Sequence, residues 1–309
     1  MGDRSTPIAR CLLPIMKIHL NGELVGKEDA KISVFDHGFL YGDGVFEGIR
    51  IYNRRIFRHD AHLLRLYRSA KAIMLEPPLP PDAMKRAIEE TVAANRLEDG
   101  YIRVVISRGP GDLGLDPRKC PKPTLVIIAT EIALYPPEVY ERGMECITAT
   151  TRRMPPDALN PGIKSLNYLN NILAKIECAR AGVPECIMLN QNGLVAECSG
   201  DNVFVYSRDY SGRLRLRTPP VTSGNLEGIT RDAVLQIARE MNVECVECDL
   251  SLFDIYSAEE AFLTGTAAEV VAMTKLDGRA IGDGKVGELT RRINERYRQL
   301  TRSEGEPVW

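Results

Sequence analysis

The sequence predicts a mixed α/β (α+β) protein of two domains. Strand-like and helix-like segments alternate along both halves of the chain, and a stretch without clear periodicity separates the halves at residues 133–143. The length of 309 residues also suits two domains. We therefore expect a smaller N-terminal domain over 1–132, a linker over 133–143 and a larger C-terminal domain over 144–309.

The N-terminal half shows its elements in a regular order. Residues 16–25 read as a hairpin that turns at Asn21-Gly22, followed by strands within 31–35 and 45–58. An apolar stripe at helical spacing predicts a helix over 61–74, with Asp60 as its cap. The remaining expected elements are an amphipathic helix within 77–97 and strands over 101–109 and 122–132.

The C-terminal half resumes the same alternation. A strand over 144–153 leads through a Pro-rich loop to a helix over 168–181 that Gly182 ends. A hairpin over 185–198 turns at Asn192-Gly193. Further strands are expected at 201–207, 213–218, 243–248 and 259–270, with helices over 228–242 and 286–303.

Composition excludes several classes of function. The chain is 44% hydrophobic and 27% charged, as in an ordinary globular protein. A net charge of -2 gives no electrostatic footprint for nucleic acid or an anionic membrane. Because no long apolar run and no signal-peptide pattern occur, we expect a cytoplasmic protein that does not span a membrane.

The cysteines and histidines do not predict a metal site. The eight cysteines are scattered, and the single C-x-x-C, Cys245 to Cys248, has no second pair after it. The alternation around these two residues favours free thiols on a strand over a metal or redox site. We therefore expect no metal.

Two small-residue turns and one arginine are candidates for binding a phosphate. Gly228, Ile229 and Thr230 begin a predicted helix, where free backbone N–H groups and the helix dipole favour an anion. Gly265, Thr266 and Ala267 form a second turn after a strand, and Arg58 follows another strand. Each of these features, taken alone, is more often an ordinary turn or surface residue than a phosphate contact.

Lys164 and Glu197 add reactive groups. Lys164 lies between Ile163 and Leu166, and if it points inward, desolvation favours its neutral amine, which can form a Schiff base with an aldehyde cofactor. Glu197 ends a hairpin strand, where a carboxylate could keep a pyridine nitrogen protonated. Taken singly, a lysine is more often solvated, and a glutamate at the end of a strand more often faces water.

Seven blocks, in order, resemble the class IV (fold-type IV) pyridoxal-phosphate aminotransferases. They are SVFDHGFLYGDGVFEGIRIY, IFRHDAHLLRL, YIRVVISRGPGDLGLDP, IKSLNYLNNILAKIE, GLVAECSGDNVF, LEGITRDAV and FLTGTAAEV. Within the family they are most similar to the branched-chain amino acid aminotransferases. The resemblance implies the fold-type IV architecture with the cofactor pyridoxal 5'-phosphate in the C-terminal domain.

The resemblance also implies residue roles. Lys164 matches the Schiff-base lysine and catalytic base, and Glu197 the carboxylate at the ring nitrogen. The other cofactor contacts match Arg58, Tyr168, Leu226, Gly228, Ile229, Thr230, Gly265 and Thr266. The substrate pocket matches Tyr41, Phe46, Gly48, Tyr101, Arg103, Thr266 and Ala267. Tyr168 follows Lys164 one residue earlier than the equivalent tyrosine does in many branched-chain enzymes.

The reaction implied is ping-pong transfer of the amino group from L-leucine, L-isoleucine or L-valine to 2-oxoglutarate. Arg103 would pair with the side-chain carboxylate of glutamate, and we expect it to have a hydrogen-bonded partner such as the Tyr41 hydroxyl. The family also implies a homodimer or an assembly of dimers, with amino acids and 2-oxo acids as small-molecule partners.

Three other functions remain open. D-amino acid aminotransferases of the same family carry an arginine and a histidine where this chain has Leu113 and Leu115. The aminodeoxychorismate lyases form another branch. A non-catalytic protein that binds phosphorylated metabolites would need the phosphate turns but neither Lys164 nor Glu197.

Overall fold

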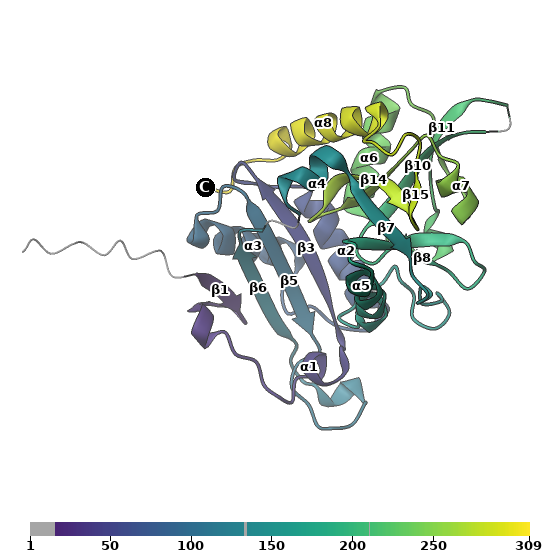
Figure 1. Cartoon of the computed structure of the whole chain (residues 1–309). Coiled ribbons are helices and arrows are strands. Elements are labelled where there is room, and N and C mark those ends of the chain that lie inside the picture. The colour runs from purple at the N-terminus through teal and green to yellow at the C-terminus, as the bar shows by residue number, and fades with distance from the viewer. Residues whose placement is uncertain (1–15, 133–134, 210) are drawn as a thin grey trace, which may run out of the picture.

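The computed structural model describes residues 16–132, 135–209 and 211–309. These residues form two β-sheets with helices packed against them, which confirms the predicted mixed α/β class (Figure 1). Among the described residues no helix is both long and apolar enough to cross a membrane.

The first sheet is antiparallel and contains the strands of the N-terminal half. Its strand order is β2-β1-β6-β5-β3-β4. The strands are β1 (Lys17–Leu20), β2 (Glu23–Gly26), β3 (Gly44–Tyr52), β4 (Arg55–Ile56), β5 (Gly100–Ser107) and β6 (Thr124–Thr130). Helices α2 (His59–Ala72) and α3 (Pro81–Asn95) pack on it and close an apolar core against the central strands. The short helix α1 (His37–Tyr41) lies at the far end of this sheet (Figure 1).

The second sheet is mixed and contains the strands of the C-terminal half. Its order is β12-β11-β10-β13-β14-β7-β8-β9, with β15 paired to β14. The strands are β7 (Met144–Thr148), β8 (Glu185–Leu189), β9 (Val195–Cys198), β10 (Asn202–Arg208), β11 (Leu214–Thr218), β12 (Cys245–Glu247), β13 (Glu260–Gly265), β14 (Glu269–Leu276) and β15 (Arg279–Ala280). The pairs β7–β8, β7–β14 and β11–β12 are parallel.

Helices cover the second sheet on its two sides. Helix α5 (Leu169–Ala181) packs on β7 and β8, and its last turn ends at Gly182 in the left-handed conformation, as the sequence predicts. Helices α6 (Ile229–Glu240) and α8 (Glu288–Ser303) pack together against β13 and β14. Two shorter helices, α4 (Pro137–Arg142) and α7 (Leu252–Tyr256), complete this half.

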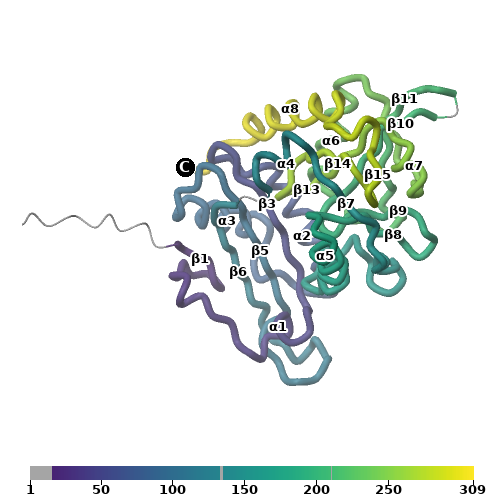
Figure 2. The backbone as a smooth tube through the Cα atoms, viewed as in Figure 1, coloured from purple at the N-terminus to yellow at the C-terminus, as the bar shows by residue number. Residues whose placement is uncertain are grey.

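The end of the chain returns to the first sheet. Pro307 forms a β-bridge with Arg55, and the Val308 N–H donates to the Arg54 carbonyl at 2.9 Å. Trp309 lies against the guanidinium of Arg54. The tube in Figure 2 shows the C-terminus beside the first sheet, so the last five residues contact the N-terminal half.

Two local predictions are wrong. Residues 31–35 are irregular, not a strand, and Val34 and Phe35 are 67% and 49% exposed because β2 already forms this edge of the sheet. Asp60 does not cap α2, since the helix begins at His59 after Arg58, and the Asp60 carboxylate accepts a bond from Lys85 Nζ at 2.6 Å.

Candidate active site

A cavity of about 370 Å³ is lined by residues of both halves of the chain. Most of the predicted site residues line it, although they come from separate strands, loops and helix ends. They are Phe46, Gly48, Tyr101, Arg103, Lys164, Tyr168, Glu197, Leu226, Gly228, Ile229, Thr230, Gly265, Thr266 and Ala267. Tyr41 and Arg58 are not among the lining residues.

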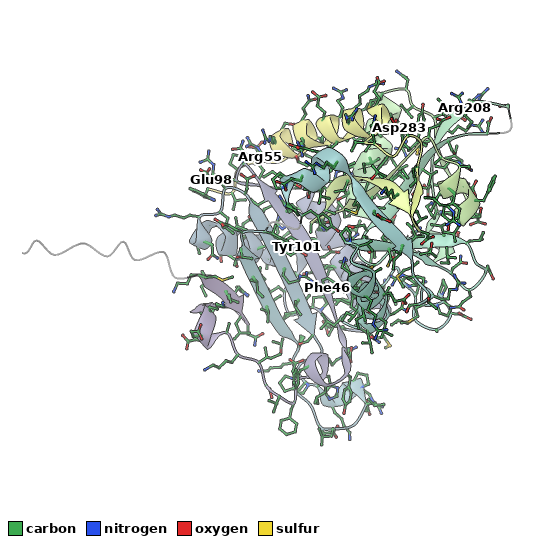
Figure 3. The ribbon with its side chains drawn as sticks, viewed as in Figure 1. Phe46, Arg55, Glu98, Tyr101, Arg208 and Asp283 are labelled. Carbon is green, nitrogen blue, oxygen red and sulfur yellow. The ribbon has the colours of Figure 1, made fainter. Side chains whose placement is uncertain are left out.

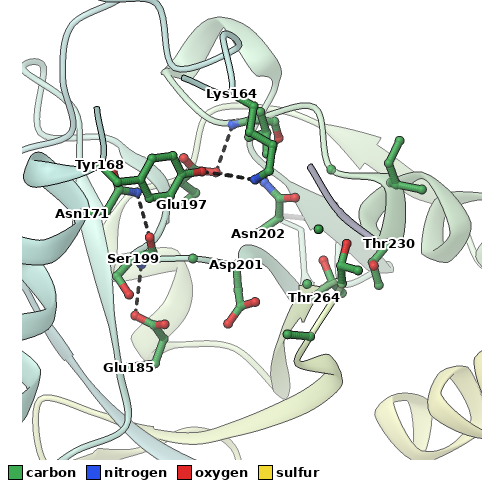
Figure 4. A pocket seen from close by; sticks show the side chains of 18 of the residues that line it. Lys164, Tyr168, Asn171, Glu185, Glu197, Ser199, Asp201, Asn202, Thr230 and Thr264 are labelled. Carbon is green, nitrogen blue, oxygen red and sulfur yellow. Dashed lines mark hydrogen bonds between the residues drawn. The ribbon is translucent and has the colours of Figure 1, made fainter. Parts of the chain in front are cut away.

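The loop that carries Lys164 is attached to the start of β3. The Phe46 N–H donates to the Lys164 carbonyl at 3.0 Å, and the Leu166 N–H donates to the Gly44 carbonyl at 2.9 Å. These bonds fix the backbone on both sides of the lysine. The side chain is half-buried, with Nζ 3.2 Å from the Tyr168 hydroxyl and 4.7 Å from the Phe46 ring centroid (Figure 4). The amine therefore faces the cavity and two aromatic rings.

Glu197 is held at the end of β9 by three contacts. Its carboxylate accepts from Leu226 N–H at 3.0 Å and from Asn202 Nδ2 at 3.2 Å, and it pairs with Arg153 at 2.7 Å. Burial raises the pKa of Glu197, and the Arg153 charge offsets part of this effect. Sequence reasoning missed Arg153, which donates to Asn171 Oδ1 at 2.9 Å and lies in a loop far from Glu197 in the chain. No local pattern could have paired the two.

The N-terminus of α6 forms an anion cradle. Gly228 is the N-cap and makes no side-chain cap bond, so the first N–H groups of the helix have no partner within it. A Cβ at Gly228 would collide with Asn202 Oδ1, and one at Gly265 with Asp201 Oδ1. Only glycine fits these close approaches. Thr264 Oγ1 is buried beside the second turn and has no hydrogen-bond partner among the described residues.

Arg65, which sequence reasoning did not select, lies beside this cradle, whereas Arg58 does not line the cavity. Arg58 bonds to Asp232 and Gln236 on the flank of α6, outside the cavity. Arg65 lines the cavity, and its Nη1 donates to the carbonyl of Glu227 at 2.7 Å, directly before Gly228. The signal that could have found it is the spacing of polar residues on α2, because His62, Arg65 and Ser69 share the buried face of that helix.

Glu47 fixes the orientation of Arg65. The guanidinium binds both carboxylate oxygens through Nε at 2.7 Å and Nη2 at 2.8 Å, and His62 Nδ1 is 2.8 Å from the same carboxylate. Burial acts to raise the pKa of Glu47, but Arg65 and His62 outweigh it and lower that pKa to about 2. Glu47 is therefore a buried carboxylate anion at neutral pH.

The predicted substrate wall comes from neighbouring strands. Phe46 and Gly48 on β3 share one face of the sheet with Tyr101 and Arg103 on β5, as the register Gly48↔Arg103 requires (Figure 3). A Cβ at Gly48 would collide with the Tyr101 hydroxyl, so glycine leaves room for that ring. The Arg103 guanidinium carbon lies 4.6 Å from the centroid of Phe46.

The expected bond between Arg103 and Tyr41 is not formed. The Tyr41 hydroxyl donates to the carbonyl of Leu113 at 2.7 Å, and its side chain is 40% exposed. Arg103 lies over the rings of Phe46 and Tyr101 instead. The reason is the position of α1, which carries Tyr41. This helix lies at the far end of the first sheet, so Tyr41 lies outside the cavity of its own chain.

An acidic patch that sequence reasoning also missed lines another part of the cavity. Glu185 accepts from the Ser199 N–H at 3.0 Å, and Asp201 lies close to it (Figure 4). Burial and the charge of Glu185 raise the pKa of Asp201 to about 8. Asp201 is therefore largely protonated at neutral pH.

The donor set fits pyridoxal phosphate. A primary amine lies in the cavity, a buried carboxylate lies opposite, and a helix N-terminus with two glycine-dependent approaches can take a phosphate. The aromatic and aliphatic side chains between these groups can contact a flat ring.

The chain matches a known family over most of its length. The family model "Amino-transferase class IV" matches residues 44–276. A relative from Methanocaldococcus jannaschii, a putative branched-chain-amino-acid aminotransferase, is 49% identical over 294 residues, which cover 95% of this chain and 99% of that protein.

Solved structures agree with this match. The crystal structure of the Escherichia coli branched-chain amino acid aminotransferase is 35% identical, with a TM-score of 0.89 over 96% of this chain and 97% of that one. The branched-chain amino acid aminotransferase from Thermobaculum terrenum, solved in its PLP form, is 29% identical, with a TM-score of 0.85 over 96% of this chain and 99% of that one.

Proposed function

The chain belongs to the class IV aminotransferases, and from that premise we propose that it is a branched-chain amino acid aminotransferase. It exchanges the amino group between L-leucine, L-isoleucine or L-valine and 2-oxoglutarate, and the products are branched 2-oxo acids and L-glutamate. The observation that carries this proposal is the shared cavity of Lys164, Glu197 and the anion cradle. A protein that only bound phosphorylated metabolites would need the cradle alone.

The residues that would hold pyridoxal phosphate come from the C-terminal half and from α2. We assign the phosphate to the N–H groups of Ile229 and Thr230, the turn at Gly265-Thr266, and Arg65 in place of Arg58. Leu226 would cover one face of the ring, Glu197 would meet its nitrogen, and Tyr168 its phenolic oxygen. When bound, the cofactor supplies an aldehyde for the amino group and a ring that accepts the electron pair of Cα.

Lys164 is the acid–base group. Its Nζ would take the proton from the substrate Cα and deliver it to the cofactor carbon that carries the aldehyde, and it would move a proton in the opposite direction in the second half-reaction. The Tyr168 hydroxyl at 3.2 Å and the ring of Phe46 hold Nζ in one region of the cavity. Glu197 stays correctly oriented because Arg153, Asn202 and the Leu226 N–H bind its carboxylate.

The substrate side supports an L-specific enzyme with two substrate types. Phe46 and Tyr101 offer apolar surface to a branched side chain, and burial contributes about 25 cal/mol per Å². Arg103 can leave its stacked position to pair with the glutamate carboxylate. The N–H groups of Thr266 and Ala267 would bind the α-carboxylate. Leu113 and Leu115 are 69% and 78% exposed and offer no cation for the grip of a D-amino acid enzyme.

We also propose that two copies assemble, with the site near their interface. Apolar side chains are exposed on and around α1 and on the neighbouring loop that carries Leu113 and Leu115. A second copy that packs there would bring its Tyr41 toward the cavity of the first. The division into a domain over 1–132 and a domain over 144–309 is likewise a proposal, and the tail at 305–309 would cross between them.

Reduction with borohydride tests the assignment of the amine. Treatment of the pyridoxal-phosphate-loaded protein, followed by peptide mapping, should place the label on Lys164. Lys175 lines the same cavity and is the internal control. A label on Lys175, or no label, would remove the basis for the proposed reaction.

A further inference from the structure

Within residues 16–132, 135–209 and 211–309, one group of side chains could hold a metal ion. It consists of Cys178 on α5 and of Glu185 and Cys186 on β8. Their ligand atoms all lie within 4.8 Å of one another, and the three residues are no more than 2% exposed. The transamination proposed above uses neither thiol.

The geometry of this cluster is set by the packing of α5 on β8. Cys178 Sγ and Cys186 Sγ both approach the Ala174 carbonyl, at 3.4 and 3.9 Å. The two sulfur atoms therefore gather on one side of the helix. Glu185 is held by the N–H groups of Cys186 at 2.8 Å and Ser199 at 3.0 Å, so its carboxylate cannot swing away from the thiols without breaking both bonds.

The charges also suit a divalent cation. The second oxygen of Glu185 lies 3.3 Å from Lys175 Nζ, and the Lys175 side chain is 50% exposed. The ammonium can move into solvent when another cation takes its place. Two thiolates and one carboxylate carry three negative charges, so a divalent ion leaves about one negative charge, which the displaced Lys175 ammonium partly offsets from the solvent side.

We propose that Cys178, Cys186 and Glu185 bind one thiophilic divalent cation, such as Zn²⁺ or Cd²⁺, behind the active cavity. Thiolate ligands select this class of ion. Both thiol protons leave to solvent as the two metal–sulfur bonds form, so no oxidant or reductant is needed. Because Glu185 also lines the active cavity, the ion would reach the cluster from that side.

The test is titration of the reduced holoenzyme with Cd²⁺, followed by the ultraviolet thiolate-to-metal band and by equilibrium dialysis. We expect one tightly bound equivalent. Cys178→Ala and Cys186→Ala should each weaken this binding by about 100-fold or more. Glu185→Gln keeps a carbonyl oxygen for the two N–H bonds and should weaken it by at least about tenfold, so the proposal stays testable if a cysteine variant fails to fold.

The matched control removes the other pair of thiols. The double variant Cys245→Ala/Cys248→Ala should bind the same equivalent with unchanged affinity, because these residues lie at β12 on the opposite edge of the sheet from β9. The proposal fails if this control loses the ion while Cys178→Ala keeps it. It also fails if wild-type protein with both thiols reduced takes up no Cd²⁺, or if mass spectrometry finds a Cys178–Cys186 disulfide in place of metal uptake.

Discussion

Buried charges define the active cavity at the scale of single residues. Glu197 and Glu47 are both buried carboxylates, yet the pKa of Glu197 is raised while that of Glu47 is lowered to about 2. The difference lies in their partners, since Glu47 accepts two bonds from Arg65 and one from His62. A cationic ring nitrogen beside Glu197 would complete the charge compensation that Arg153 begins.

Arg65→Met should weaken cofactor binding more than Arg58→Met does. Loss of a charge-assisted contact to phosphate costs about 1.5–3 kcal/mol, which corresponds to roughly a 10- to 100-fold rise in the dissociation constant. Arg58 binds Asp232 and Gln236 outside the cavity, so Arg58→Met is the matched control and should change this constant by less than about threefold. Titration of the apoprotein with pyridoxal phosphate gives both values. A larger rise in the dissociation constant for Arg58→Met than for Arg65→Met would show that Arg58, not Arg65, binds the phosphate.

At the scale of the elements, strand register places the residues of the proposed substrate pocket on one face of the first sheet. The pairing of β3 with β5 brings Phe46, Tyr101 and Arg103 onto one face, and a shift of β5 by one residue would put Tyr101 and Arg103 on the face opposite Phe46.

Arg103→Met should therefore separate the two half-reactions. The kcat/KM for glutamate should fall by about 10- to 100-fold because a charged contact is lost, while that for leucine should change by less than about threefold. Stopped-flow measurement of each half-reaction provides the comparison. An equal fall in kcat/KM for glutamate and for leucine would show that Arg103 does not bind the glutamate carboxylate selectively.

The contact between α2 and β3 should make stability depend on pH. Glu47→Gln breaks a buried pair and should lower the free energy of unfolding by about 3–5 kcal/mol at pH 7. The stability from Glu47 is complete above its unfolded pKa of about 4.3 and is lost as the pH falls through its folded pKa of about 2. The difference in free energy of unfolding between the wild type and Glu47→Gln should therefore become smaller below about pH 4.

Urea unfolding of the wild type and of Glu47→Gln at pH 7 and at pH 3 measures this difference in free energy of unfolding. Asp60→Asn is the control on the same helix, because the Asp60–Lys85 pair is largely exposed and should contribute less than about 1 kcal/mol. A gap that stays constant between the two pH values would contradict the assignment of Glu47 as a paired anion.

The exposed apolar surface suggests an assembly at the scale of the whole molecule. Phe39 and Leu115 are 68% and 78% exposed near α1, while α5 presents Ile172 and Ile176 on one face beside the cavity. Large exposed apolar patches are typical of interaction sites. A single copy leaves these side chains, together with Tyr41, in water.

The double variant Phe39→Asp/Leu115→Asp should be smaller in solution than the wild type and should lose most of its turnover. Two charges in an apolar interface cost several kcal/mol, enough to dissociate a dimer at micromolar concentration. Light scattering gives the mass. Phe253→Asp is the control, since Phe253 on α7 in the C-terminal half is 72% exposed and should change neither mass nor activity. An unchanged mass in the double variant would place the interface on another face.

Local signals in the sequence were sufficient for most elements, whereas the roles of the candidate site residues came from the family resemblance. The helices α3, α5, α6 and α8 follow apolar periodicity that each segment carries by itself. The turns at Gly228 and Gly265 could be identified as possible phosphate contacts because a helix start offers free N–H groups and glycine lets the backbone approach a ligand. Lys164 and Glu197 were selected by residue type together with neighbours in sequence.

The tertiary structure decided which side chains meet. Arg65 and not Arg58 lines the cavity because Arg65 lies on the buried face of α2, whereas Arg58 precedes the helix in the left-handed conformation and bonds to α6. Arg153 reaches Glu197 only through packing between segments distant in the chain, and Cys178 reaches Cys186 through the packing of α5 on β8. A sequence encodes the period of each element locally, whereas the rotation of a helix and the neighbours of a strand depend on burial of the whole chain. That is why the kinds of reactive group could be inferred from residues alone, and their partners could not.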